Sequence, residues 1–228
     1  NMSNFQENVI LAQCCNYRIG GPARYFFEAE NADDIKWAVA EAKNKKLPIF
    51  VLGGGTNLLI GDEGFNGLVL KPTTGSLGRD GKNIVAGAGA EMEELLRFAA
   101  RNSLSGLEWA GGLPGTVGGA IRGNAGAFGG EIKDSIIEVE SLDIENGEQR
   151  RRNRKECEFD YRTSIFKKLG GREIILSAVF GLSSGDHDEI HRLTSEKIEY
   201  RKSRHPLEYP NIGSIFKNVP VELVPKNI

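Results

Sequence analysis

The chain has 228 residues, of which 39% are hydrophobic and 26% are charged, and this composition is typical of a globular protein rather than a disordered one. The formal net charge of −2 gives no general attraction for nucleic acid, so we expect no nucleic-acid partner. No apolar run approaches the roughly 18 residues of a membrane-spanning helix, so we expect no membrane partner. Three cysteines without C-x-x-C spacing favour a cytoplasmic location.

The first third of the chain reads as a β-α-β unit. Residues 24–30 are rich in aromatic and aliphatic residues, and a short apolar run at 49–52 is followed by glycine, so both are predicted strands. Between them, Asn31 or Asp33 caps a predicted helix with apolar residues at helical spacing. Residues 68–70 form a further predicted strand. A glycine-rich loop separates the last two strands.

A second unit follows. We predict a strand at 84–86, a helix at 91–102, a long glycine-rich loop at 110–130, and strands at 136–144 and 174–182. Asn146-Gly147 is a strong hairpin signal. After it comes a basic run, interpreted as a solvated loop or hairpin edge rather than a binding patch; it contains Arg150, Arg151, Arg152, Arg154 and Lys155. A charged helix is predicted at 186–203, and residues 183–185 are the best domain boundary.

The glycines are unevenly distributed. The chain has 29 glycines where roughly 16 are expected, and most of the excess lies in two loops, at 53–67 and 111–130. Glycine lets backbone N–H groups approach an anion, so Gly53-Gly54-Gly55 after a strand is either a phosphate cradle or a plain tight turn. The loop matches neither G-x-x-x-x-G-K-[ST] nor G-x-G-x-x-G, which argues against a P-loop NTPase and a Rossmann domain.

The second loop has few side chains to fill space, so either backbone or a flat ligand must fill it. Two such loops on a β-α-β framework predict an extended ligand with a diphosphate and a planar ring. The residues alone leave a dinucleotide and a flavin open.

Six segments occur in order within residues 17–218: IGGPA at 19–23, LGGGTNLL at 52–59, GLPGTVGGA at 112–120, NAGAFG at 124–129, YRTS at 161–164 and GSIFKN at 213–218. Together they resemble the UDP-N-acetylenolpyruvoylglucosamine reductase family, the flavoenzymes of bacterial peptidoglycan precursor synthesis. The short spacing from Arg162 to Ser214 resembles the family's second type, which lacks an inserted tyrosine-bearing loop. One departure is Cys14-Cys15-Asn16, where the family usually has hydroxyl residues.

The resemblance implies an α+β fold of the vanillyl-alcohol-oxidase (PCMH) type. It implies two FAD-binding subdomains, at 1–74 and 75–183, and the start of a substrate-binding domain at 184–228. The family continues beyond the residue equivalent to 228 and carries a catalytic glutamate there. We therefore expect this chain alone to bind FAD and to turn over poorly, in the bacterial cytoplasm.

The resemblance also implies the reaction. NADPH reduces noncovalently bound FAD, which passes a hydride to the enolpyruvyl double bond of UDP-N-acetylglucosamine enolpyruvate to give UDP-N-acetylmuramate. Arg162 matches the catalytic arginine and suits the charge that builds on the substrate carboxylate, and Ser214 matches the proton donor. The positions matching substrate contacts are Tyr161, Arg204, Lys217 and Asn218. The positions assigned to FAD are Gly53, Gly54, Gly55, Thr56, Asn57, Leu58, Gly112, Pro114, Gly115, Thr116, Gly118, Gly119, Asn124, Gly126 and Ala127.

Two other readings stay open. One is an FAD-dependent alcohol or hydroxy-acid oxidase or dehydrogenase of the same fold; many of these bind flavin covalently through His or Cys, and here every His and Cys lies outside the glycine-rich loops. The other is a non-catalytic flavin- or nucleotide-binding module. His187 and His191 are spaced i, i+4 without a third ligand, so no metal site is expected.

Overall fold

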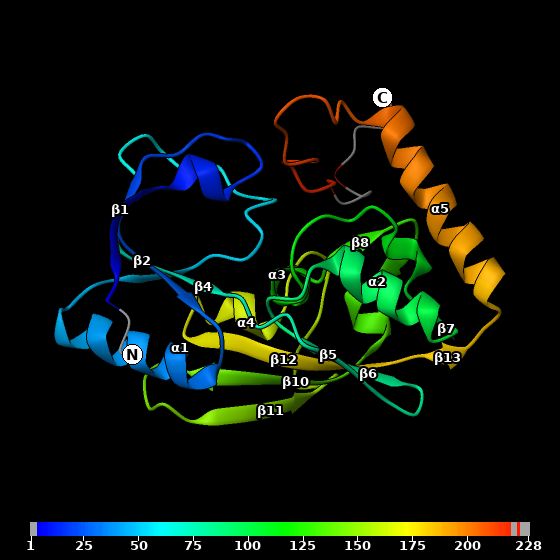
Figure 1. The fold of residues 1–228 in the computed structure, drawn as a ribbon, viewed down its shortest axis with the longest axis horizontal. Helices are drawn as coiled ribbons and strands as arrows, with labels where there is room; N and C mark the ends of the chain where they lie inside the picture. The colour runs from blue at the N-terminus through cyan, green and yellow to red at the C-terminus, as the bar shows by residue number, and fades with distance from the viewer. Residues whose placement is uncertain (1–3, 220–222, 224–228) are drawn as a thin grey trace.

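The computed structural model describes residues 4–219 and residue 223, which fold around two β-sheets (Figure 1). The first sheet has the strand order β1-β2-β4-β3, with β1 antiparallel to β2 and with β2 and β3 parallel to β4. Its helix α1 connects β2 to β3. The elements are β1 (Gln6–Ile10), η1 (Leu11–Cys14), β2 (Pro22–Ala29), α1 (Ala32–Asn44), β3 (Ile49–Val51) and β4 (Phe65–Pro72).

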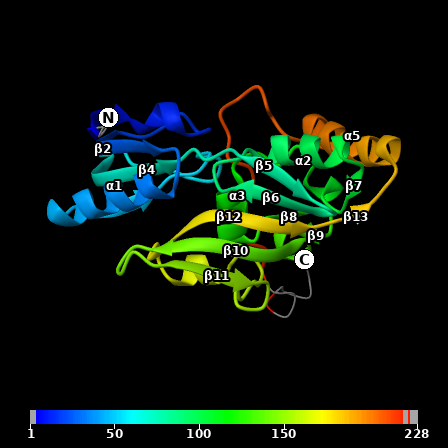
Figure 2. The same cartoon turned by 60° about the horizontal axis from the view of Figure 1, so that its bottom comes forward.

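The second sheet is antiparallel and has the strand order β11-β10-β12-β6-β5. Figure 2 shows β11 at one edge of this sheet, and β5 is the strand at the other edge. The helix α5 packs against η2 and α2. The elements are β5 (Leu77–Asp80), β6 (Asn83–Gly87), α2 (Met92–Arg101), β7 (Leu104–Ser105), η2 (Glu108–Ala110), α3 (Val117–Gly123), β8 (Gly126–Ala127), β9 (Gly130–Glu131), η3 (Ile132–Asp134), β10 (Ile136–Asp143), β11 (Gln149–Asn153), α4 (Ile165–Lys168), β12 (Glu173–Gly181), β13 (Ser183–Ser184) and α5 (His187–Arg204).

The strongly periodic helices form where the sequence predicts them. Asn31 caps α1, its Oδ1 accepting a hydrogen bond from the Asp34 N–H at 2.9 Å. The apolar stripe of α1 is buried against β2 and β4. In α2, Leu95 and Ala99 are buried in the core of the second unit. The predicted β-α-β order and the hairpin at Asn146-Gly147 are confirmed.

The prediction of a loop throughout 110–130 is wrong for residues 117–123, which form α3. The three glycines of this helix have low helix propensity, which is why the sequence favours a loop. Tertiary contacts override that preference, because Val117 and Ile121 are fully buried and the Thr116 hydroxyl caps the first turn. The edge strands β1 and β5 were also not predicted from the sequence.

The two sheets share an apolar cluster. Phe27 and Leu70 of the first sheet pack with Leu142 and Ile174 at the near ends of β10 and β12. The Lys43 ammonium of α1 adds a hydrogen bond to the Glu145 carbonyl at 2.8 Å. These contacts fix the first sheet against the second, and so set the relative position of the loops that leave each of them. No helix among the described residues has the length and apolar character needed to span a bilayer.

The basic run lies at the hairpin edge, as predicted, but its alternate arginines are not simply solvated. Arg152 donates to Glu173 at 2.6 Å, and Arg150 pairs with Asp143 at 2.9 Å. Arg172, the residue directly before β12, also pairs with Asp143, at 2.9 Å. Both carboxylate side chains are essentially inaccessible to solvent. The run therefore neutralises two buried carboxylates of the second sheet.

This cluster makes the fold sensitive to acid. Burial alone raises the pKa of Glu173, but hydrogen bonds from Arg152 and Ser141 outweigh it and hold the pKa below its ordinary value of 4.5. A depressed folded-state pKa contributes stability above that ordinary value, and the contribution is lost as the pH falls below it. We expect Glu173→Gln to lower the free energy of unfolding by about 3 kcal/mol at neutral pH. The variant should also lose less stability than the wild type on acidification.

Urea unfolding between neutral pH and pH about 3 measures both effects. Glu158→Gln is the matched control, because Glu158 makes an exposed ion pair with Lys168 and its loss should change stability little. Equal stability of Glu173→Gln and the wild type at neutral pH would contradict the role of the cluster.

Candidate active site

The first glycine-rich loop follows β3 with an unusual backbone. Within the part of the chain that the structure describes, none of the N–H groups of residues 53–57 donates a hydrogen bond to a protein acceptor. Gly55 has φ +63°, and a Cβ placed there would lie 2.2 Å from the Cys14 carbonyl oxygen. The Asn16 N–H donates to the Gly55 carbonyl at 3.0 Å. Successive backbone N–H groups that are free of protein acceptors can bind an anion.

The two glycine-rich loops touch each other backbone to backbone. A Cβ on Gly54 would lie 2.9 Å from the Gly115 Cα, and a Cβ on Gly53 would lie 2.8 Å from the Thr116 Oγ1. Gly115, at φ +101°, would meet Thr56 Oγ1 at 2.7 Å. Protein atoms therefore occupy the space beside these glycines: backbone beside Gly54, and threonine hydroxyls beside Gly53 and Gly115. Their role is to let the loops approach.

The other predicted cofactor residues lie in or near these two loops. Gly118 packs on Ala88, and the nearest atom to a Cβ on Gly119 is Thr116 Oγ1 at 3.5 Å. Gly112, at φ +69°, lies against Arg201 of α5. Leu58 packs on the apolar cluster of the first sheet. Of the remaining residues, Asn57 and Pro114 are exposed, and Gly126 and Ala127 form β8.

Asn124, a predicted cofactor residue, makes hydrogen bonds within the protein through its side chain. It is fully buried in the left-handed conformation, with φ +43°. Its Nδ2 donates to the Asp160 carbonyl at 3.0 Å, and its Oδ1 accepts from the Lys133 N–H at 3.1 Å. Both ends of the amide are thus used by the protein. Asn124 ties the loop before β8 to the turn that carries Tyr161 and Arg162.

That turn presents the predicted catalytic arginine. Asp160 and Thr163 exchange both backbone hydrogen bonds at 3.1 Å, which leaves Tyr161 and Arg162 at the tip. The Arg162 guanidinium donates to the Gly126 carbonyl at 2.7 Å and lies 5.3 Å from the centroid of the Tyr161 ring. Arg162 therefore stands directly beside the second glycine-rich loop.

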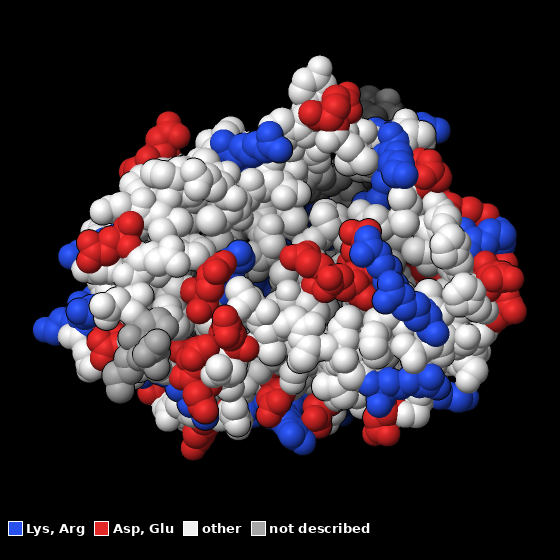
Figure 3. Space-filling view, viewed as in Figure 1, with Lys and Arg blue, Asp and Glu red and all other residues white. Residues whose placement is uncertain are grey.

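The C-terminal segment returns to the same place. In Figure 1, residues 205–219 arch back from the end of α5, and Figure 3 shows the surface hollowed beneath this arch. The Asn218 N–H donates to the Tyr161 hydroxyl at 3.2 Å. Lys217 lies close enough to Lys167 to affect its titration. The structure thus brings together four predicted residues: Tyr161, Arg162, Lys217 and Asn218.

Two other predicted site residues, Ser214 and Arg204, have no bond to Arg162 in the described structure. Ser214 is exposed, and the Arg204 guanidinium lies 5.6 Å from the centroid of the Tyr200 ring on α5. Among the described residues, no hydrogen bond or ion pair joins either of them to Arg162.

Two basic residues at this site were missed by sequence reasoning, Arg122 and Lys167. Burial, followed by the positive charges of Lys217 and Arg122, lowers the pKa of the Lys167 ammonium. Within the described part of the chain, no carboxylate forms an ion pair with Arg122, Arg162, Lys167 or Lys217. This group, which we call the basic cluster, can attract an anionic ligand. The only sequence signal for it was the position of Lys167 just after YRTS.

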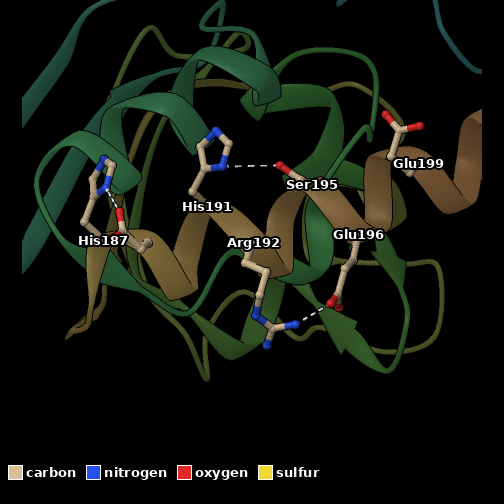
Figure 4. Close-up of a pocket in the computed structure, with 7 residues that line it drawn as sticks. His187, His191, Arg192, Ser195, Glu196 and Glu199 are labelled. Carbon is tan, nitrogen blue, oxygen red and sulfur yellow. Dashed lines mark hydrogen bonds and ion pairs between the residues drawn. The ribbon is translucent and has the colours of Figure 1, made fainter.

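A shallow depression on α5 lies apart from this site (Figure 4). Its side chains pair with one another along the helix: His187 with Asp188 at 3.1 Å, and Ser195 with His191 at 3.5 Å. A search of the described residues finds no group of three or more potential metal ligands. The depression is a solvated helix face, and we assign it no ligand.

The profile of the FAD binding domain family matches residues 23–153. A UDP-N-acetylenolpyruvoylglucosamine reductase from Synechococcus is 39% identical, with 94% of this chain and 71% of that protein aligned. The crystal structure of the reductase from Thermus caldophilus superposes with a TM-score of 0.81 at 32% identity, covering 95% of this chain and 76% of that one. The crystal structure of 6-hydroxy-D-nicotine oxidase from Arthrobacter nicotinovorans superposes with a TM-score of 0.53 at 21% identity, covering 71% of this chain and 36% of that one. At this identity the similarity shows the fold alone. The chain therefore has the PCMH-type α+β fold, contains an FAD-binding domain, and belongs to the UDP-N-acetylenolpyruvoylglucosamine reductase family.

Proposed function

We propose that this protein binds FAD noncovalently and uses NADPH to reduce the enolpyruvyl double bond of UDP-N-acetylglucosamine enolpyruvate. Two observations on the described residues carry the proposal: the N–H groups at 53–57 have no protein acceptor, and the turn that holds Arg162 lies beside the second glycine-rich loop, among cations without an ion-pair partner. Backbone donors suit a cofactor diphosphate, and the Arg162 guanidinium suits the carboxylate of the substrate.

The loop at 53–57 would hold the diphosphate, and the glycine loop at 112–119, which contacts it, would complete the cofactor site. The residues present fit FAD, because the N–H groups of residues 53–57 have no protein acceptor in the described part of the chain and the glycines bring the two loops together. FAD, when bound, supplies the hydride that is transferred. Next to Gly55, Cys14 contributes its carbonyl oxygen and Cys15 its Cα and Cβ, while the Cys15 thiol donates to the Ile19 carbonyl at 3.3 Å.

Arg162 would bind the carboxylate of the enolpyruvyl group. The guanidinium fork matches a carboxylate, and it would stabilise the negative charge that grows there as the double bond accepts hydride. Lys217, Asn218 and Tyr161 would contact the sugar nucleotide. Ser214 would give the proton to the α-carbon, which requires the arch at 205–219 to bring its hydroxyl to the Arg162 side. Arg204 would bind substrate only after the same movement.

We also propose a domain organisation for the chain. Residues 1–74 and 75–183 would be the two FAD-binding subdomains, each built around one sheet. Residues 184–228 would begin the substrate-binding domain, with α5 as its attachment to η2 and α2. Residues 220–222 and 224–228 lie outside the described part.

An oxidase of the same fold with covalently bound flavin is less compatible with the structure. Burial raises the pKa of the Cys157 thiol to about 12, so it is not available as a thiolate. The three histidines lie on α5 or directly after it. Acid precipitation of the flavin-loaded protein should leave the pellet colourless and the FAD in solution. A yellow pellet would support the oxidase.

Product formation tests the proposed reaction even if turnover is slow. With FAD-loaded protein at a concentration comparable to that of the enolpyruvyl sugar nucleotide, NADPH should give the lactyl ether, which is heavier by two hydrogens in mass spectrometry. Small alcohols and hydroxy acids should leave the flavin oxidised. Absence of the heavier product after prolonged incubation would contradict the proposal.

A further inference from the structure

We propose that Lys167 is a positioning residue for Arg162, and that its ammonium sets the direction of the Arg162 guanidinium by fixing the backbone of that residue. The Lys167 Nζ donates to the Arg162 carbonyl at 3.1 Å. The inference rests on the proposed function, in which Arg162 binds the carboxylate of the substrate.

The backbone of Arg162 needs such support. It is the second residue at the tip of the turn closed by Asp160 and Thr163, and its φ is +55°. This is the left-handed region, where glycine or asparagine is preferred and another L-residue costs about 1–2 kcal/mol. A bulky arginine persists there only when its surroundings hold it, and such strain gathers at functional sites.

Arg162 is held at both ends. The ammonium of Lys167 binds its carbonyl, and its guanidinium binds the carbonyl of Gly126. Lys167 lies on α4, and the start of this helix is fixed in place. Ser164 there is fully buried, and its hydroxyl donates to the Arg122 carbonyl at 2.8 Å. The strained turn, α4 and the end of α3 thus form one connected unit around Arg162.

No ion pair accounts for the position of the Lys167 ammonium in the described structure. Its neighbour Lys168 makes an ordinary ion pair with Glu158 at 2.8 Å. Lys167 has no carboxylate partner among the residues that the structure describes, and it faces Arg122 of α3 and Lys217 of the C-terminal arch. Like charges oppose its protonated form. In the described structure, the Lys167 side chain makes one hydrogen bond, the bond to the Arg162 carbonyl.

A pair of ligands tests this role on the FAD-loaded protein. The enolpyruvyl sugar nucleotide and UDP-N-acetylglucosamine share the diphosphate but differ in the carboxylate that Arg162 would bind. By calorimetry, Lys167→Met should weaken binding of the first about five- to tenfold and leave the second within about twofold. Lys167→Arg should restore binding, because its guanidinium can donate to the same carbonyl. Lys168→Met, the matched control, should change neither ligand.

A double-mutant cycle separates action through Arg162 from direct binding. In an Arg162→Met background, Lys167→Met should cause no further loss, and additive losses would overturn the inference. Equal weakening of both ligands would also overturn it, because Lys167 would then bind the shared diphosphate. So would unchanged binding of both. A wild-type protein that does not prefer the enolpyruvyl ligand would instead contradict the proposed function, and the inference with it.

Discussion

Alanine at Gly55 is expected to abolish FAD binding. The substitution places a Cβ at φ +63° and 2.2 Å from the Cys14 carbonyl oxygen, with the Cys15 Cα at 2.7 Å. Backbone strain and the clash together cost about 3 kcal/mol or more, and both are relieved by moving the donor row of residues 53–57. The dissociation constant for FAD should rise at least about 100-fold. Flavin fluorescence titration measures the change.

Two further variants keep this prediction interpretable. Gly54→Ala introduces a contact of 2.9 Å with the Gly115 Cα and no positive φ, so it should separate the loops while the fold is retained. Its FAD affinity should fall about tenfold. Gly78→Ala on β5 meets nothing within 4 Å and is the control. Circular dichroism verifies folding. Wild-type affinity in folded Gly55→Ala would contradict the assignment of this loop to the cofactor.

Methionine at Arg162 is expected to remove catalysis while leaving FAD bound. Arg162 contacts the Gly126 carbonyl of β8 and not the donor row of residues 53–57, so the loop that would hold the diphosphate should persist. Loss of a charged donor at the growing negative charge costs about 100- to 1000-fold in rate. Arg162→Lys should recover only part of the rate, because an ammonium lacks the planar fork. The rate at which substrate reoxidises the reduced flavin is the measurement.

The control for this prediction is Arg101→Met, at the exposed end of α2. It removes the same charge from the protein and should leave the reoxidation rate unchanged. An Arg162→Met variant that reoxidises at the wild-type rate would remove Arg162 from the proposed mechanism.

Local patterns in the sequence predict much of this fold, because its periodic elements obey them. The apolar spacing of α1 and α2 and the hairpin at Asn146-Gly147 each depend on neighbours in the chain. The helix α3 does not. Gly118 and Gly119 favour a loop, and the helix forms because Val117 and Ile121 are buried by distant parts of the chain.

The site was predictable as a set of motifs but not as an arrangement. The glycine loops could be located, yet their direct contact joins Gly54 to Gly115 across 61 positions of sequence (115 − 54 = 61). The basic cluster draws on residues 122, 162, 167 and 217, and no spacing rule connects them. Asn124 matched a family motif, but only its burial revealed that the amide serves the protein.

An anaerobic flavin spectrum tests the central claim most directly. The FAD-loaded protein should lose its oxidised flavin absorbance on addition of NADPH. Addition of the enolpyruvyl sugar nucleotide should restore that absorbance without oxygen, while UDP-N-acetylglucosamine should not. A flavin that is reduced by NADPH and stays reduced in the presence of the enolpyruvyl substrate would contradict the account.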